Sequence, residues 1–249
     1  MTDIQTEEIT YSADGVDMKG YIAWDAARGG PGPAILVVHE WWGRNEYAER
    51  RARMLAEAGY TGMALDLYGD GRTAVNPDEA GELMMARIDD MEGTRARFNA
   101  ALEALKKHHS VDVSRTGAIG YCFGGGVVTH MARMGADLDV TGSFHGAVGL
   151  AAIDGPDHFD CKVMVYNGEA DSLIDDDQIS GFKATMEKTG ANYDFIQLPG
   201  ALHGFSNPMA TGNGKKYGLP LAYNKLADES SWAHLLLTFE HVFGQGASE

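Results

Sequence analysis

This 249-residue chain lacks the features by which nucleic-acid-binding and membrane proteins are recognised. Its 20 Lys and Arg residues are outnumbered by 36 Asp and Glu residues, which gives a formal net charge of -16. Nucleic acids and anionic membrane surfaces bind through a basic footprint, so this balance disfavours both as partners. No apolar run approaches the roughly 18 residues of a membrane span. We therefore expect a small molecule as the partner.

Cysteine is equally scarce, with only Cys122 and Cys161 in the chain. The opening MTDIQTEEIT is polar and acidic, without the basic and apolar regions of a secretory signal. Nothing therefore implies an oxidising compartment. The sequence predicts a cytoplasmic protein with free thiols, either a monomer or a small homo-oligomer.

The common cofactor motifs are absent as well. There is no CxxC pair, no Walker loop and no GxGxxG fingerprint, and His39-Glu40 lacks the second histidine of a zinc-binding HExxH helix. The pair His108-His109 ends a charged segment and is interpreted as a solvated helix terminus. We expect no metal, nucleotide or redox cofactor.

The distribution of apolar residues predicts an α/β fold with a mostly parallel central sheet. The length and the 44% hydrophobic composition fit one domain, 1–249, because α/β architectures often reach about 200–250 residues. Residues 7–24 alternate around Ala13-Asp14-Gly15, which predicts an antiparallel hairpin. Short apolar runs typical of strands buried on both faces follow. They are 34–38, 62–67, 116–119, 140–144, 163–166 and 193–198.

Helical periodicity separates several of these runs, at 127–131, at 179–186 and most clearly at 232–243. Helices that connect parallel strands cover both faces of the sheet. Residues 206–220 show no such period and contain three glycines, so they are interpreted as a structureless loop. Such a loop is either a wall or flap over a pocket or an ordinary surface excursion.

Cys122 occupies the position of a catalytic nucleophile. Gly120-Tyr121-Cys122-Phe123-Gly124 follows an apolar strand and precedes an amphipathic segment, the context of a nucleophile elbow. Glycine is needed two residues before and after the nucleophile because strand and helix approach closely there. A helix N-terminus and a nearby imidazolium both favour the thiolate. The alternative is a small buried side chain at a glycine-lined crossing.

A base and an acid follow in the chain order expected after such a nucleophile. His203 comes just after the 193–198 strand, and Asp171 just after the 163–166 strand. His203 would accept the thiol proton, and Asp171 would orient the imidazole. Glu169 and Asp175 remain alternatives for the carboxylate, because they lie in the same loop.

Residues 39–43, HEWWG, end the first buried strand. A loop at this point provides one oxyanion-hole amide, and the residue after the nucleophile provides the other, which indicates Trp41 and Phe123. Glu40 would lie beside the thiol, unless it is a solvated loop carboxylate. The expected substrate pocket is mainly aromatic, although His145 could equally be a structural histidine. Its residues are Trp42, Tyr121, His145, Phe205 and Asn207.

The motifs HEWWG, GYCFGGG, NGEAD and LHGF occur in this order. With them, the sequence resembles the dienelactone hydrolase family of α/β-hydrolases from residue 34 to the C-terminal helix. The resemblance implies an α/β-hydrolase fold and cleavage of esters or lactones through an acyl-enzyme. It also implies a triad of Cys122, Asp171 and His203, with Glu40 as the family's glutamate that holds the resting thiol.

One departure from the family pattern concerns substrate charge. The namesake enzymes hold an anionic lactone with arginines, one of them four residues past the catalytic histidine, where this chain has Asn207. Only Arg72 and Arg87 precede Asp89 in the region of the other anchor. We therefore expect neutral esters or lactones to be preferred. An acyltransferase or thioesterase on the same triad, and a non-catalytic binding protein of the same fold, are the alternative functions.

Overall fold

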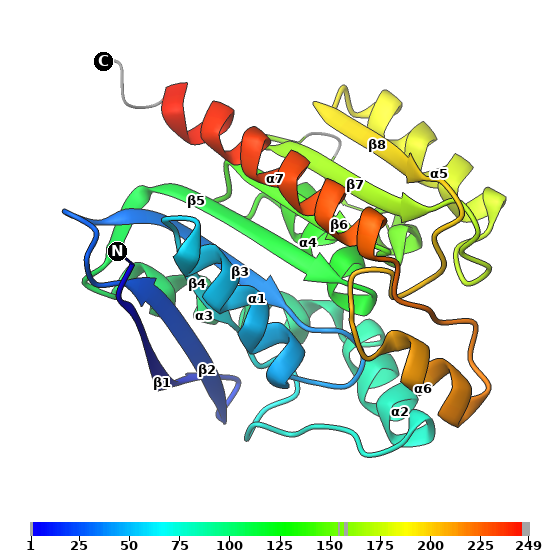
Figure 1. Cartoon of the computed structure of the whole chain (residues 1–249), viewed down its shortest axis with the longest axis horizontal. Coiled ribbons are helices and arrows are strands. Elements are labelled where there is room, and N and C mark those ends of the chain that lie inside the picture. The colour runs from blue at the N-terminus through cyan, green and yellow to red at the C-terminus, as the bar shows by residue number, and fades with distance from the viewer. Residues whose placement is uncertain (1, 154, 157–158, 246–249) are drawn as a thin grey trace. The chain divides into compact units, whose positions relative to one another are not determined.

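Strands and helices alternate along the chain in the computed structural model, which describes residues 2–153, 155–156 and 159–245 (Figure 1). The strands are β1 (Ile4–Ala13), β2 (Val16–Asp25), β3 (Gly32–Val38), β4 (Thr61–Ala64), β5 (Val111–Tyr121), β6 (Val140–Phe144), β7 (Lys162–Gly168) and β8 (Tyr193–Leu198). The helices are α1 (Glu46–Glu57), α2 (Pro77–Ile88), α3 (Met91–Lys106), α4 (Phe123–Arg133), α5 (Asp176–Lys188), α6 (Ala210–Tyr217), α7 (Lys225–Gln245) and a short 3-10 helix (Val148–Ala152). The chain divides within β5 into two units, residues 1–118 and 119–249.

The predicted N-terminal hairpin is confirmed. Strands β1 and β2 pair antiparallel, with Ala13 opposite Val16. The two residues between them, Asp14 and Gly15, have φ angles of 53° and 74°. A two-residue turn of this kind needs positive φ at both positions, and Asp-Gly is a sequence that adopts it readily. Strand β2 continues antiparallel to β4, and β4 is parallel to β3.

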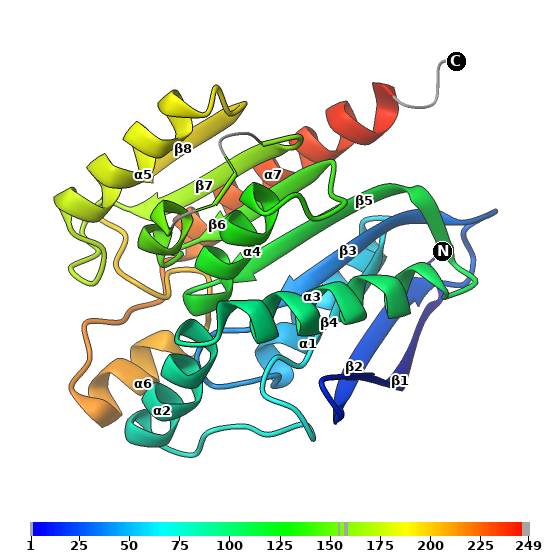
Figure 2. The ribbon, with the colours of Figure 1, turned by 180° about the vertical axis from the view of Figure 1, so that it is seen from behind.

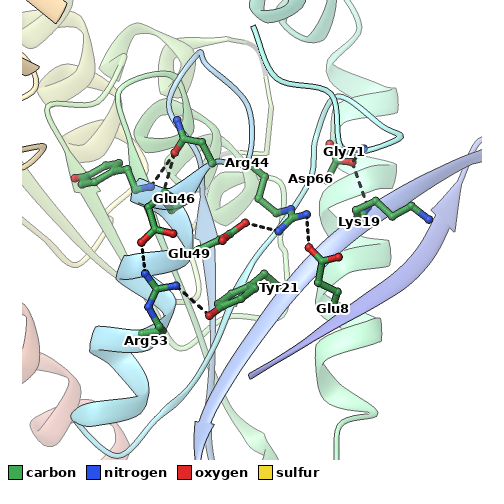
Figure 3. A network of polar contacts seen from close by, with 12 residues as sticks. Glu8, Lys19, Tyr21, Arg44, Glu46, Glu49, Arg53, Asp66 and Gly71 are labelled. Atoms are coloured by element: carbon green, nitrogen blue, oxygen red, sulfur yellow. Dashed lines mark hydrogen bonds and ion pairs between the residues drawn. The ribbon is translucent and has the colours of Figure 1, made fainter. Parts of the chain in front are cut away.

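Ionic side chains tie α1 to this hairpin within the first unit (Figure 3). The Arg44 guanidinium lies between the carboxylates of Glu8, at 3.0 Å, and Glu49, at 2.5 Å. Arg53 of α1 donates to the hydroxyl of Tyr21 at 3.0 Å. The Arg44 side chain is only 9% exposed, so these contacts hold the hairpin against α1 in a largely shielded position.

In the second unit, β6, β7 and β8 are parallel, and every residue of β6 is buried. Helix α7 covers one face of these strands, and α4 and α5 cover the other (Figures 1 and 2). This arrangement explains the continuous apolar runs and confirms the mixed α/β class with mostly parallel strands. It also leaves the carboxyl ends of the strands free to carry polar loops.

The prediction of a structureless loop at 206–220 is wrong, because α6 occupies most of it. Before the helix begins, the Asn207 side chain accepts a hydrogen bond from the backbone amide of Met209. Gly218 ends the helix in the left-handed conformation, with φ 67°. A Cβ atom on Gly214 would lie 2.5 Å from the carbonyl oxygen of Leu221. These glycines therefore serve a helix end and a close backbone approach.

Candidate active site

The predicted strand–turn–helix context of Cys122 is confirmed. Cys122 lies between β5 and α4 with φ 54° and ψ −120°, a conformation that a non-glycine residue rarely adopts. A Cβ atom on Gly120 would lie 2.0 Å from the carbonyl oxygen of Gly124. Glycine at 120 is therefore a steric requirement of the turn. The Cys122 thiol is free and partly exposed at the helix N-terminus.

The glycines after Cys122 allow a different close approach. A Cβ atom on Gly125 would lie 2.7 Å from the Cα atom of Gly146, and one on Gly126 would lie 2.4 Å from the carbonyl oxygen of Ala147. Helix α4 therefore packs directly on the backbone that follows β6. This contact fixes the helix, and with it the amides of its first turn.

The carboxylate of Asp171 lies against the imidazole of His203. Asp171 Oδ2 and His203 Nδ1 are 2.8 Å apart, and the Asp171 side chain has no exposed surface. The other oxygen, Oδ1, accepts the backbone N–H of Leu173 at 2.9 Å. The alternative carboxylates have other partners, since Glu169 accepts the amide of Gly200 and Asp175 caps α5. Of the three, Asp171 is the one that meets His203.

Backbone hydrogen bonds hold the loops of Asp171 and His203 together. The amide of Ala170 donates to the carbonyl of Ala201 at 3.0 Å. A Cβ atom on Gly168 would lie only 2.4 Å from that same carbonyl oxygen. The glycine of the NGEAD motif thus allows the two loops to meet, and the carboxylate reaches the imidazole as a consequence.

The charge state of His203 is set by its neighbours. Burial lowers the pKa of His203, but the negative charge of Cys122 and the hydrogen bond to Asp171 raise it more, and the resulting pKa is about 10. A hydrogen bond between the side chains of Cys122 and His203 also raises this pKa. The imidazolium is therefore favoured at neutral pH.

The structure also locates the second unit's predicted pocket residues. Tyr121, His145, Phe205 and Phe123 have no exposed surface, and the His145 ring lies 5.0 Å from the His203 ring and 5.1 Å from the Phe205 ring, between centroids. Asn207 is buried too. The assignment of these side chains to a substrate pocket stays a prediction.

Ser206 is a residue that the sequence interpretation missed. Its side chain is fully buried, and its hydroxyl lies 2.8 Å from Nε2 of His145. No periodicity or motif distinguishes this serine from others in the chain. Only the tertiary contact identifies it.

In the first unit, hydrogen bonds fix the backbone that contains Glu40, Trp41 and Trp42. His39 Nδ1 donates to the carbonyl of Glu40 at 2.6 Å, the Tyr68 hydroxyl donates to that of Trp41 at 2.8 Å, and a backbone amide donates to that of Trp42 at 2.9 Å. Burial lowers the pKa of His39, so its ring stays neutral. The side chain of Glu40 is buried, and both tryptophans are half-buried.

Within residues 2–153, 155–156 and 159–245, no three His, Cys, Asp or Glu side chains are grouped as a metal site. No helix in the same ranges combines the length and apolarity that crossing a bilayer requires.

Comparison with known proteins supports the resemblance seen in the motifs. The model of the dienelactone hydrolase family matches residues 18–243. The chain belongs to this family. Cys122, Asp171 and His203 lie inside the matched region, and the chain is a dienelactone hydrolase-like ester or lactone hydrolase.

Relatives within and around the family are distant but cover most of the chain. Protein usf of Aquifex pyrophilus and a putative carboxymethylenebutenolidase of Aquifex aeolicus are each 28% identical over 207 residues, which is 80% of this chain and 86% of theirs. Among solved structures, a dienelactone hydrolase-like promiscuous phosphotriesterase from metagenomic libraries has a TM-score of 0.87 at 28% identity. That match covers 96% of this chain and 98% of the other. The α/β-hydrolase fold expected from the motifs is confirmed.

Proposed function

We propose that this dienelactone hydrolase relative cleaves neutral carboxylic esters or lactones with Cys122 as the nucleophile. The thiolate sulfur attacks the carbonyl carbon, and the His203 imidazolium gives its proton to the departing alkoxide, which leaves an acyl-thioester on Cys122. Water then attacks the thioester, and His203 takes its proton, which releases the acid and restores the thiolate.

The buried contact between Asp171 and His203 is the observation that carries this proposal. A carboxylate on Nδ1 holds the ring so that Nε2 is the nitrogen that exchanges a proton. The charge of Cys122 contributes to the raised pKa of His203, so sulfur and imidazole act on each other. A thiolate and imidazolium pair is a reactive form of a cysteine nucleophile at neutral pH.

The remaining machinery is assigned from position and from the family resemblance. The amide of Phe123 is at the first residue of α4, where helix amides lack intrahelical acceptors. The proposed second oxyanion donor is the amide of Trp41, whose loop is held by the hydrogen bond from Tyr68. Donors fixed in advance stabilise a developing oxyanion without reorganisation. Glu40 is proposed as the carboxylate that holds the resting thiol.

Substrate preference is proposed from the side chain at position 207. An anionic substrate needs a local cation in a protein with a net charge of -16. Asn207 supplies none, and its carbonyl oxygen accepts the amide of Met209. The proposed pocket side chains Trp42, Tyr121 and Phe205 favour apolar burial instead, with roughly 25 cal/mol gained per Å².

The test compares Cys122→Ala with the matched control Cys161→Ala. Hydrolysis is measured with p-nitrophenyl esters and with pairs of neutral and carboxylate-bearing lactones of similar size. Cys122→Ala is expected to lose at least about a thousandfold in kcat, because the covalent path is removed. Cys161→Ala is expected to keep wild-type rates, since Cys161 is buried and burial raises the pKa of its thiol to about 12.

Near-wild-type turnover by Cys122→Ala would contradict the nucleophile assignment. A preference of tenfold or more in kcat/KM for anionic lactones corresponds to about 1.4 kcal/mol. Such a preference would contradict only the proposed preference for neutral substrates. Added alcohols or amines that compete with water for the acyl group would indicate the acyltransferase alternative.

A further inference from the structure

His145 lies between the nucleophile and the loop of the catalytic histidine, yet the proposed reaction uses neither of its nitrogens. The residue follows β6 and has no exposed surface. The backbone N–H of Cys122 is shared between the carbonyl of Phe144, at 3.1 Å, and Nδ1 of His145, at 3.2 Å. Nε2 of His145 lies 2.8 Å from the hydroxyl oxygen of Ser206. One ring therefore joins the nucleophile elbow to the segment three residues beyond His203.

These contacts determine where the proton of the His145 ring lies. A backbone amide can only donate, so Nδ1 must be the unprotonated acceptor. The single proton of the neutral ring is then on Nε2, which donates to Ser206 Oγ. A ring in this state adds no positive charge beside the His203 ring, whose centroid is 5.0 Å away. The imidazolium of His203 is thereby spared a repulsion.

The backbone of His145 is itself constrained. Its φ angle is 40°, a region that few non-glycine residues adopt. Its amide donates to the carbonyl of Tyr166 at 2.8 Å, which ties the turn after β6 to the neighbouring strand β7. Strained backbone of this kind persists where surrounding contacts hold it in place, and such sites are enriched near functional residues.

We propose that His145 is a positioning residue for the hydrolysis, which holds the backbone of Cys122 and the loop of His203 in one fixed arrangement. This inference rests on the proposed triad. The Cys122 sulfur and the His203 imidazole come from loops after different strands, and the His145 side chain hydrogen bonds to both regions. A shift of about 1 Å between catalytic groups can cost on the order of a hundredfold in rate.

Four substitutions separate the two hydrogen bonds from packing. His145→Asn keeps an acceptor near the position of Nδ1 and suits the positive φ, because asparagine tolerates left-handed backbone. His145→Gln places its amide near the position of Nε2 and keeps a donor for Ser206. His145→Phe fills the space without either hydrogen bond. Ser206→Ala removes only the distal partner.

The variants are compared by kcat, by KM and by the pH profile of Cys122 alkylation with iodoacetamide, with thermal unfolding as the check of folding. His145→Phe is expected to lower kcat about a hundredfold, with little change in KM, and to alter the alkylation profile. His145→Asn is expected to keep kcat and the alkylation profile closer to wild type than His145→Gln does, because the contact to the amide of Cys122 helps to fix the backbone of the elbow. Ser206→Ala is expected to give the smallest loss.

Equal losses in the Asn and Phe variants, or a Gln variant better than the Asn variant, would overturn the proposal. If His145→Phe does not fold, the order of the Asn and Gln variants decides. Alkylation of Cys122 needs no substrate, so it tests His145 even if Cys122→Ala keeps turnover and the triad is wrong. Unchanged alkylation in every folded variant would also overturn the positioning role.

Discussion

Asp66 in the first unit and Asp171 in the second are both buried carboxylates that follow a strand. The two oxygens of Asp66 accept four backbone N–H groups at 2.8 to 3.2 Å, two of which are drawn in Figure 3. The donors are the amides of Lys19, Tyr68, Gly69 and Gly71. All four are backbone groups, whose proton stays in place across the range of physiological pH.

Asp171 divides its oxygens between one backbone amide and an imidazole. The imidazole can change its charge, so the carboxylate stabilises one protonation state of its partner over the other. Asp66 instead fixes a turn between β4 and the residues that follow it. The comparison shows that both sites bury a carboxylate, and that the partner determines whether such a carboxylate can assist a proton transfer.

The largest expected effect comes from Asp171→Asn. An amide in this position no longer stabilises the imidazolium and favours the wrong tautomer of His203. We expect kcat to fall by about 10³ to 10⁴, while the variant still unfolds cooperatively. Steady-state hydrolysis of the best ester, together with thermal unfolding, checks this. A variant that retained a tenth or more of wild-type kcat would remove Asp171 from the mechanism.

Asp66→Asn is expected to affect stability instead. Replacing one acceptor oxygen with an NH₂ group sets a donor against backbone donors, so the free energy of unfolding should fall by about 2 to 4 kcal/mol. Urea unfolding followed by fluorescence measures the change, and kcat is determined on the folded fraction. The comparison between the two carboxylates fails if this variant loses as much kcat as Asp171→Asn.

The smallest predicted effect is a difference in pH dependence. Folding raises the pKa of His203 from its ordinary value near 6.5 to about 10. Protonation of His203 therefore stabilises the fold fully below about pH 6.5, and this contribution is lost as the pH rises through about 10. The stability difference between wild type and His203→Gln should shrink over that range, whereas the amide partners of Asp66 contribute no such titration.

Histidine-labelled NMR gives a direct measurement of the same shift. The His203 ring is expected to titrate near pH 10 in the wild type and at a lower pH in Cys122→Ala, because the negative charge that raises its pKa is gone. Titration at the same pH in both proteins would show that Cys122 and His203 do not interact. That result would leave the role of Asp66 unaffected.

Local sequence was sufficient to predict several parts of the site. The glycines around Cys122 predicted the elbow, because only glycine fits where the strand and helix backbones nearly touch. Strand-like alternation on both sides of Asp14 and Gly15 predicted the hairpin, because Asp-Gly readily adopts the positive φ angles of a two-residue turn. Periodicity failed at α6, because its glycines resemble those of a loop, and the helix depends on the packing of Gly214 against Leu221.

The choice among Asp171, Glu169 and Asp175 could not be made from the sequence, because all three lie in one short loop. The close approach of Gly168 to Ala201 decides it, since this brings Asp171 alone to the imidazole. The pairing of His145 with Ser206 is likewise invisible in the sequence.

By itself, then, the sequence determined the features that depend on adjacent residues: the elbow at Cys122, the hairpin, the order of the strands along the chain, and the family. Tertiary structure alone decided which carboxylate contacts His203, which groups contact the His145 ring and that residues 210–217 form a helix. The physical reason is the distance along the chain over which each interaction acts. Steric limits and periodicity act between neighbours in the chain, whereas a hydrogen bond between loops depends on backbones that only the folded sheet brings together.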